Sequence, residues 1–352
     1  MQLTDFQFKS FDAKTASDTM WQHIIDITET MYREKAPHDP LPPQDLLRQQ
    51  LEHLAAHPQF DLEISLLYRP EKEDPIGLLM IGFAKSGSPD YDNQEHMVFN
   101  DIYVVEPQRR QGIGTMLLKH TVSLCQAKSI VLLQAMSETD TGNAFCDHYG
   151  FEVALRGREN RLMMDKVDWA MVEEWSQAGP KRAPGVEIIT FEGLYEPDLE
   201  AYCKIYTETM NQQPLGELEG LESTYTPERM RDDHEKRTER GSQSITKITV
   251  EPDGTISGLT EIGHNPKTPH RVGQGLTGVQ EAYRGRGLGK WLKAEMLLTI
   301  RKHYPDIEFI STGNANTNAP MLSINDRLGF VLYKQSAAYK RAIVDLVERL
   351  GM

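Results

Sequence analysis

The chain has 352 residues, of which 39% are hydrophobic and 26% charged, and this is typical of a soluble protein with two compact domains. Its formal net charge of −14 repels nucleic acid and anionic membrane surfaces, so we expect neither as a partner. No apolar run approaches the roughly 18 residues that cross a bilayer, and the polar N-terminus lacks a signal-peptide core, which predicts a cytoplasmic protein. The three cysteines form no C-x-x-C pair, so we expect no disulfide framework and no metal site.

The first half of the chain shows helical, strand and glycine-loop patterns in succession. A proline-rich break at 36–43 separates the first two helical patterns, because proline cannot continue a helix. The expected elements are helices at 14–35 and 44–57, strands at 61–68, 75–84 and 96–105, a loop at 109–114, a helix from 113, a strand at 129–136, a helix at 143–149 and a strand at 151–164.

Residues 176–185, Ser-Gln-Ala-Gly-Pro-Lys-Arg-Ala-Pro-Gly, have the composition of a linker. After them the same order of patterns begins again. The elements expected there are a strand at 186–191, helices at 198–210 and 227–240, strands at 244–250, 255–262 and 271–280, a second glycine loop, a helix from 288, a strand at 307–312 and a short helix that ends at 327–330.

Two features recur at nearly equal spacing and indicate an internal duplication. Arg109 and Arg284, which open the two glycine loops, lie 175 positions apart (284 − 109). The Gly-Phe pairs that begin at Gly150 and Gly329 lie 179 positions apart (329 − 150). We therefore predict two halves of the same architecture.

The glycine loops carry the main functional signal. The second reads Tyr283-Arg284-Gly285-Arg286-Gly287-Leu288-Gly289-Lys290, and the first reads Arg109-Arg110-Gln111-Gly112-Ile113-Gly114. Glycine leaves backbone amides open to a ligand, and the helix that follows directs its free N–H groups to the same place. Each loop thus predicts a seat for a phosphate or a pyrophosphate, although the arginines could instead be ordinary surface residues.

An Arg-x-x-Gly-x-Gly loop between a strand and a helix, followed by Asn and Gly-Phe, resembles the GNAT superfamily of acyl-CoA-dependent N-acyltransferases. The match covers both halves, so the chain resembles the tandem type, of the mycothiol synthase-like group. The resemblance implies an α/β fold with a mixed sheet in each of two GNAT-like domains, 1–175 and 186–352, joined by 176–185. It also implies acetyl-CoA as the cofactor and the primary amine of a small molecule as the acceptor.

The resemblance assigns the cofactor contacts residue by residue. The two glycine loops would hold the pyrophosphate, Val104 and Val279 would present backbone groups to the pantetheine arm where two central strands part, and Asn318 would contact the cofactor from the far wall. The loop residues concerned are Arg109, Arg110, Gln111, Gly112, Ile113, Gly114, Thr115, Arg284, Gly285, Arg286, Gly287, Leu288, Gly289 and Lys290.

One position departs from the family pattern. Many members place a tyrosine four residues before the glycine of Gly-Phe, where it can protonate the departing thiolate. Here those positions hold Cys146 and Asn325, so Asn325 is the candidate of the second half, and Tyr149 and Tyr333 are further tyrosines nearby. We expect Cys146 to be a buried, inert thiol rather than a nucleophile.

Acyl transfer to an amine also needs a group that takes the amine proton. Glu261 lies within an apolar strand of the second half, where a carboxylate is costly unless it is used or paired, and Asp101 is its analogue in the first half. The alternative is that Glu261 lies on the solvent face of an alternating strand. Acidic residues at 213–222 are expected to line the acceptor cleft, or else to form a solvated acidic face.

These features together predict acetyl-CoA-dependent N-acetylation of a small amine, with the second half as the catalytic one because its loop is richer in glycine and arginine. Two other functions stay open. One is a non-catalytic acyl-CoA-binding or regulatory protein, favoured by the missing tyrosines. The other is acetylation of a protein N-terminus or lysine. The sequence makes no prediction of oligomeric state.

Overall fold

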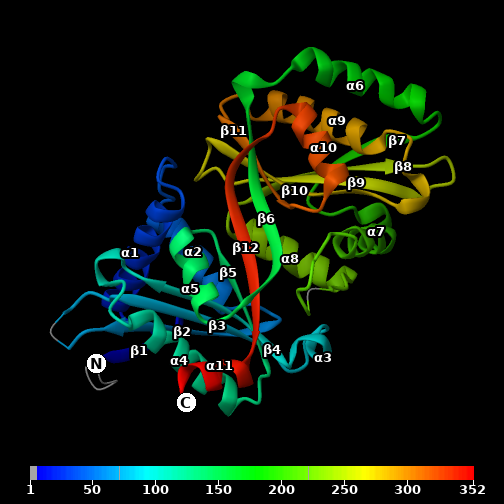
Figure 1. Cartoon of the computed structure of the whole chain (residues 1–352). Coiled ribbons are helices and arrows are strands. Elements are labelled where there is room, and N and C mark those ends of the chain that lie inside the picture. Colours follow the sequence, from blue (N-terminus) through cyan, green and yellow to red (C-terminus); the bar gives the residue numbers. More distant parts are fainter. Residues whose placement is uncertain (1–5, 71, 221) are drawn as a thin grey trace. The chain divides into compact units, whose positions relative to one another are not determined.

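The computed structural model describes residues 6–70, 72–220 and 222–352 (Figure 1). Its helices and strands fall into two compact units, which do not follow the order of the chain. The first unit comprises Met1–Arg156, Gly216–Gly220 and Ser336–Met352, and the second comprises Gly157–Leu215 and Leu221–Gln335. The fold is α/β with a mixed sheet in each unit, as predicted.

The first unit has a mixed sheet covered by helices on both faces. Its strands follow the order β1-β2-β3-β4-β5-β12, in which only β4 and β5 run parallel. Its elements are β1 (Gln7–Phe11), α1 (Asp18–Lys35), α2 (Gln44–Ala55), β2 (Phe60–Tyr68), β3 (Gly77–Ala84), α3 (Tyr91–Gln94), β4 (Met97–Val104), α4 (Ile113–Ala127), β5 (Leu132–Ser137), α5 (Asp140–His148) and α11 (Ile343–Leu350), with the end of β12 (Val331–Ala342).

The second unit repeats this arrangement. Its strands follow the order β7-β8-β9-β10-β11-β6, in which only β10 and β11 run parallel. Its elements are the end of β6 (Glu152–Met163), α6 (Trp169–Arg182), β7 (Glu187–Glu192), α7 (Leu199–Asn211), α8 (Pro227–Glu239), β8 (Gln243–Val250), β9 (Ile256–His264), β10 (Arg271–Val279), α9 (Leu288–His303), β11 (Phe309–Ala315) and α10 (Ala319–Leu328).

The last strand of each sheet comes from the other half of the chain. The end of β6 pairs with β11 from Gly157 to Met163, and the end of β12 pairs with β5 from Ala337 to Ala342. The chain therefore passes from the first compact unit to the second at residue 157, within β6, whereas the sequence predicts this boundary at 175. The strand patterns could not show this, because an apolar strand fits either sheet equally well.

Apolar side chains fill both faces of each sheet. In the first unit, α4 and α11 share one hydrophobic cluster with the sheet, and α1 and α2 share another. In the second unit, α6, α9 and α10 contribute to one cluster, and α7 and α8 to another. Each glycine loop consequently lies at the start of a helix, α4 or α9, that is held firmly against the sheet.

The expected linker at 176–185 is largely helical. Residues 176–182 form the second half of α6, whose first turn is capped by the Asp168 side chain, an acceptor for the amide of Met171 at 3.1 Å. Pro180 removes one backbone hydrogen bond, the one that an N–H at this position would make to the carbonyl of Ser176, and α6 ends two residues later at Arg182. Packing decides the structure here: α6 lies along α9 (Figure 1), and the two share a buried cluster that includes Val172 and Leu297.

Gly179 makes the close approach of α6 to α9 possible. A Cβ at this position would overlap the indole ring of Trp291, which is 6% exposed. We expect Gly179→Ala to lower the free energy of unfolding by about 1–3 kcal/mol, the usual cost of overpacking. Urea unfolding measures this loss, and Gln177→Ala on the exposed side of the same helix is the matched control. Equal stability of the two variants would contradict the packing described.

Candidate active site

Each glycine loop leads into a helix whose first amides are uncapped. α4 follows Gly112 and α9 follows Gly287, which adopt φ of 79° and 86°, the left-handed region that glycine allows. Neither residue offers a side chain to the first turn, whereas Ser17 and Thr226 cap α1 and α8. The first N–H groups of α4 and α9 can therefore bind an anion, as the sequence predicts.

The loop arginines make the same contact in both halves. Arg109 Nε donates to the carbonyl of Val104 at 2.8 Å, and Arg284 Nε donates to the carbonyl of Val279 at 3.1 Å. Each bond ties the loop to the end of the strand before it. These arginines were expected to hold the pyrophosphate, and the structure shows that one nitrogen of each positions the loop. The recurrence supports the internal duplication.

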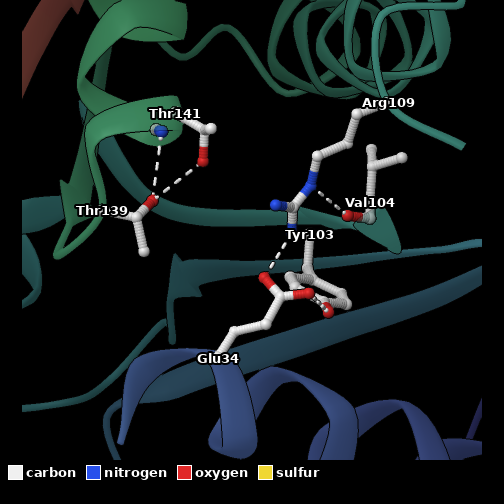
Figure 2. A network of polar contacts seen from close by, with 7 residues as sticks. Glu34, Tyr103, Val104, Arg109, Thr139 and Thr141 are labelled. Carbon is white, nitrogen blue, oxygen red and sulfur yellow. Dashed lines mark hydrogen bonds and ion pairs between the residues drawn. The ribbon is translucent and has the colours of Figure 1, made fainter. Parts of the chain in front are cut away.

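The second contact of these arginines differs between the halves. Arg109 pairs with Glu34 of α1, whose other oxygen accepts the Tyr103 hydroxyl at 2.6 Å (Figure 2). Burial and the Glu34 charge raise the pKa of Tyr103, so its hydroxyl stays a donor. Arg284 instead donates to the neutral Gln212 at 2.6 Å. The carboxylate beside the first loop is thus fully engaged.

The central parallel strands of each sheet part before they end. β4 pairs with β5 only from Met97 to Asn100, and β10 pairs with β11 only from Arg271 to Gly273. Beyond these residues, β4 and β10 are hydrogen-bonded on their antiparallel side alone, up to Val104 and Val279. Both units therefore contain the opening that the resemblance implies.

Only the second opening has a β-bulge. In β10, Gln274 pairs with Ile262 and Thr277 pairs with Thr260, so two residues of β10 face the single residue Glu261 of β9. β4 pairs with β3 in regular register from Val98 to Val104. A bulge turns backbone amides out of the ladder, so the second opening can present a backbone donor that the first lacks.

Glu261 lies directly over the bulge. Its Oε1 accepts the hydroxyl of Tyr206 at 3.0 Å and the amide of Leu276 at 3.3 Å. Gly275 leaves room for the carboxylate, since a Cβ there would lie 2.8 Å from Oε1. Among the residues that the structure describes, none donates to Oε2. One oxygen therefore fixes the carboxylate, and the other is available as a proton acceptor.

Tyr206 was not singled out from the sequence. It lies on α7, is 8% exposed, and packs edge-on against Tyr225 with ring centroids 4.6 Å apart. Burial and the Glu261 charge raise its pKa, which keeps it a neutral donor to the carboxylate. Its spacing of four residues from Tyr202, on a helix beside a strand that holds a carboxylate, was the available signal.

Asp101 is not the structural counterpart of Glu261. Gly77 pairs with Val104 as Gly258 pairs with Val279, so Met80, three residues after Gly77, occupies the place of Glu261. Asp101 lies opposite Met80 on β4, 4.0 Å from Lys35. Desolvation raises the pKa of its carboxyl, and Lys35 opposes the shift. The first opening thus has an apolar side chain where the second has a carboxylate.

Asn325 lies in the interior rather than at the surface of the opening. It is fully buried, its Oδ1 accepts from Lys293 Nζ at 2.8 Å, and its Nδ2 donates to Asn314 at 2.9 Å. Lys293 is 2% exposed, and desolvation lowers its pKa to about 7. Asn325 therefore holds a buried amine, a partner that no sequence pattern indicated.

Four other residues that the sequence analysis named, Asn318, Cys146, Tyr149 and Tyr333, each make a specific contact or are buried. The Asn318 side chain caps α10 by accepting the amide of Met321 at 3.4 Å. Burial raises the pKa of Cys146 to about 12, which agrees with an inert thiol. The hydroxyls of Tyr149 and Thr115 share a hydrogen bond of 2.6 Å. The Tyr333 ring stacks on the guanidinium of Arg161, 3.3 Å from its centroid.

Part of the acidic segment at 213–222 belongs to the first unit. Glu217 pairs with Lys340 at 3.2 Å, Glu219 pairs with His96 at 3.2 Å, and Gly220 accepts from Gln94 at 2.7 Å. Residues 216–220 thus dock on the first sheet. The expectation that this whole segment lines the acceptor cleft of the second half is corrected for these residues.

Three cations surround the start of α9. Arg182 at the end of α6 lies against Gly287, where a Cβ would be 3.3 Å from its Cδ. Burial, Arg327 of α10 and Arg182 together lower the pKa of Lys290, so the three charges act on one another. Arg182 lay in the expected linker and Arg327 beside the Gly-Phe pair, so sequence reasoning assigned neither to the site.

The described residues contain no group of three or more metal-ligating side chains, and none of their helices is long and apolar enough to cross a membrane. The model of the acetyltransferase (GNAT) family matches residues 21–151. A search among curated proteins finds no match.

Solved structures resemble the chain over nearly its whole length. A tandem GNAT protein from the clavulanic acid biosynthesis pathway is 21% identical, with 96% of this chain and 98% of that one covered and a TM-score of 0.74. A GCN5-related N-acetyltransferase from Sphaerobacter thermophilus is 15% identical, with 96% of both chains covered and a TM-score of 0.65. A putative acetyltransferase from Pyrococcus horikoshii is 11% identical over 97% of this chain and 91% of that one, with a TM-score of 0.55. At these identities the likeness shows the fold.

Proposed function

We propose that the protein transfers an acetyl group from acetyl-CoA to the primary amine of a small molecule, because residues 21–151 match the model of the acetyltransferase (GNAT) family and the fold of the whole chain is similar to that of a tandem GNAT protein. We further propose that the second half performs the reaction. The observation that carries this assignment is the bulge of β10 beneath Glu261, which the first half lacks.

The residues present fit a CoA thioester. Uncapped first turns at α4 and α9 suit its diphosphate, and the openings beside β4 and β10 offer backbone groups to an extended arm. The residues that would hold the thioester at the second seat are Val279, the loop from Arg284 to Lys290, and Asn318. Bound there, acetyl-CoA supplies the activated acetyl group.

The side chains and amides of the second opening support the chemistry. Oε2 of Glu261 accepts the amine proton, directly or through a water, so that the amine attacks in its neutral form. A backbone amide of the bulge other than that of Leu276, which is bonded to Glu261, donates to the carbonyl oxygen as negative charge develops on it. Tyr206 holds the carboxylate in place. The departing thiolate takes its proton from solvent, because Asn325 is a buried amide with no acidic proton to give.

The family model matches the first half, whereas the bulge and the carboxylate lie in the second. These two observations are compatible, because the match to the family model can rest on the first glycine loop and the core around it, neither of which needs a catalytic carboxylate. The first half then binds acetyl-CoA without turnover or supports its partner. We expect isothermal titration to find two acetyl-CoA sites per chain, because both helix starts are uncapped. A stoichiometry of one would contradict the two-seat proposal.

Release of free CoA with a panel of amines tests the proposed activity. We expect turnover with at least one small primary amine and none without an acceptor. Peptides with a free N-terminus or lysine form a second arm of the panel. Tight binding of acetyl-CoA with no turnover in either arm would instead favour an acyl-CoA-binding protein, as the residue at position 325 suggests.

A further inference from the structure

We propose that Arg182, Lys290 and Arg327 form a subsite for a phosphomonoester, which in acetyl-CoA is the 3′-phosphate of the ribose. The inference rests on the proposed function, because it adds a second anionic contact to the carrier held at the second glycine loop. The subsite is distinct from the diphosphate seat in that side chains of three helices make it, rather than backbone amides.

The first observation is that these cations are uncompensated. In the part of the chain that the structure describes, Arg182, Lys290 and Arg327 form no ion pair, although the protein carries 52 acidic residues against 38 basic ones. The neighbouring Arg286 behaves differently, since its guanidinium donates to Glu251 at 2.8 Å. Three unpaired cations at one place in an acidic protein are a site of positive potential.

The second observation is that the fold brings the cations together at a cost. They come from the last turn of α6, the first turn of α9 and the last turn of α10. A Cβ at Gly289 would lie 3.5 Å from Cδ1 of Ile324, which places α10, one turn before Arg327, beside the first turn of α9. Burial lowers the pKa of Lys290 most, the charges of Arg327 and Arg182 lower it further, and a doubly charged anion between them would relieve that repulsion. Lys290 also lies 5.3 Å from the ring centroid of Trp175, which places its ammonium on the α6 side.

The third observation is that, in the described part of the first half, neither the counterpart of Lys290 nor that of Arg327 is a lysine or arginine. The counterpart of Lys290, by the spacing of the loops, is Thr115, whose hydroxyl is bonded to Tyr149. The counterpart of Arg327, by the spacing of the Gly-Phe pairs, is His148. The cluster therefore belongs to the half that we propose as catalytic and is not a general property of the duplicated fold.

Calorimetric titration with CoA and with 3′-dephospho-CoA tests the subsite on the full chain. We expect the unaltered protein to bind CoA about 10- to 100-fold more tightly at the second seat, the range of charge-assisted hydrogen bonds. In the triple variant Arg182→Gln, Lys290→Gln and Arg327→Gln, which keeps the side-chain stems, the ratio falls towards one. Lys302→Gln at the other end of α9 is the matched control and leaves the ratio unchanged.

The outcomes separate this inference from the proposed function. Equal affinities of the unaltered protein for the two carriers would overturn the subsite and leave the acetyl-CoA proposal standing. A triple variant that weakens both carriers equally would overturn it too, because its cations would then act on the diphosphate. A triple variant that changes neither affinity would also overturn it. Binding of neither carrier by the unaltered protein would overturn both proposals.

Discussion

Glu261→Gln is expected to lower kcat by about 10²- to 10⁴-fold, the range of a lost general base, and to leave the dissociation constant of acetyl-CoA unchanged. The amide of glutamine can still accept from Tyr206 and Leu276, so the bulge and its hydrogen bonds are retained. What is lost is the free oxygen that takes a proton. Steady-state release of CoA measures kcat, and calorimetry measures the carrier affinity.

Asp101→Asn is the matched control for this experiment. It removes one carboxylate charge from the opening of the first half, where Met80 stands at the place of Glu261 and β4 has no bulge. We expect its kcat to equal that of the unaltered protein. Normal turnover in Glu261→Gln together with a large loss in Asp101→Asn would place catalysis in the first half. Tyr206→Phe keeps the carboxylate and removes one donor, so its loss should be smaller than that of Glu261→Gln.

Local patterns predict most of the fold, and the exchange of strands shows where they stop. The helices at 14–35 and 44–57 correspond to α1 and α2, and the three strands of each half correspond to β2–β4 and β8–β10. The pattern does not say which sheet receives the end of β6 or β12, because both sheets offer an antiparallel edge. Such pairings are set by contacts between distant segments, which a window of sequence does not contain.

The same distinction applies to the candidate site. The glycine loops could be recognised from the sequence because a backbone with positive φ before an uncapped helix favours glycine at fixed positions. The bulge leaves a weaker trace, the single glycine at 275, and Glu261 was found only as a carboxylate in an apolar strand. Arg182 could not be found this way, because the packing of Gly179 on Trp291 brings α6 beside the second loop. A residue that reaches the site from a distant segment can be identified only from the tertiary structure.

Lys293→Met is expected to change how stability depends on pH. The ammonium of Lys293 is buried without a carboxylate, so its pKa is about 7 in the folded chain and near the ordinary 10.5 when unfolded. Between these values the unfolded chain binds more protons, and the free energy of unfolding therefore rises with pH. The penalty of burying the charge is complete below pH 7 and is lost as pH approaches 10.5. Methionine has the length of the stem and no charge, so this slope disappears.

The difference between the two proteins isolates Lys293 from every other titrating group. We expect the stability of Lys293→Met relative to the unaltered protein to fall by about 3 kcal/mol between pH 6.5 and pH 9, at roughly 1.4 kcal/mol for each pH unit above 7. Urea unfolding at four pH values measures it. A constant offset remains at every pH, because Asn325 loses the amine to which it is bonded. Lys302→Met, exposed on the same helix, should show no pH-dependent difference. A constant difference for Lys293→Met as well would mean that Lys293 keeps an ordinary pKa in the folded chain.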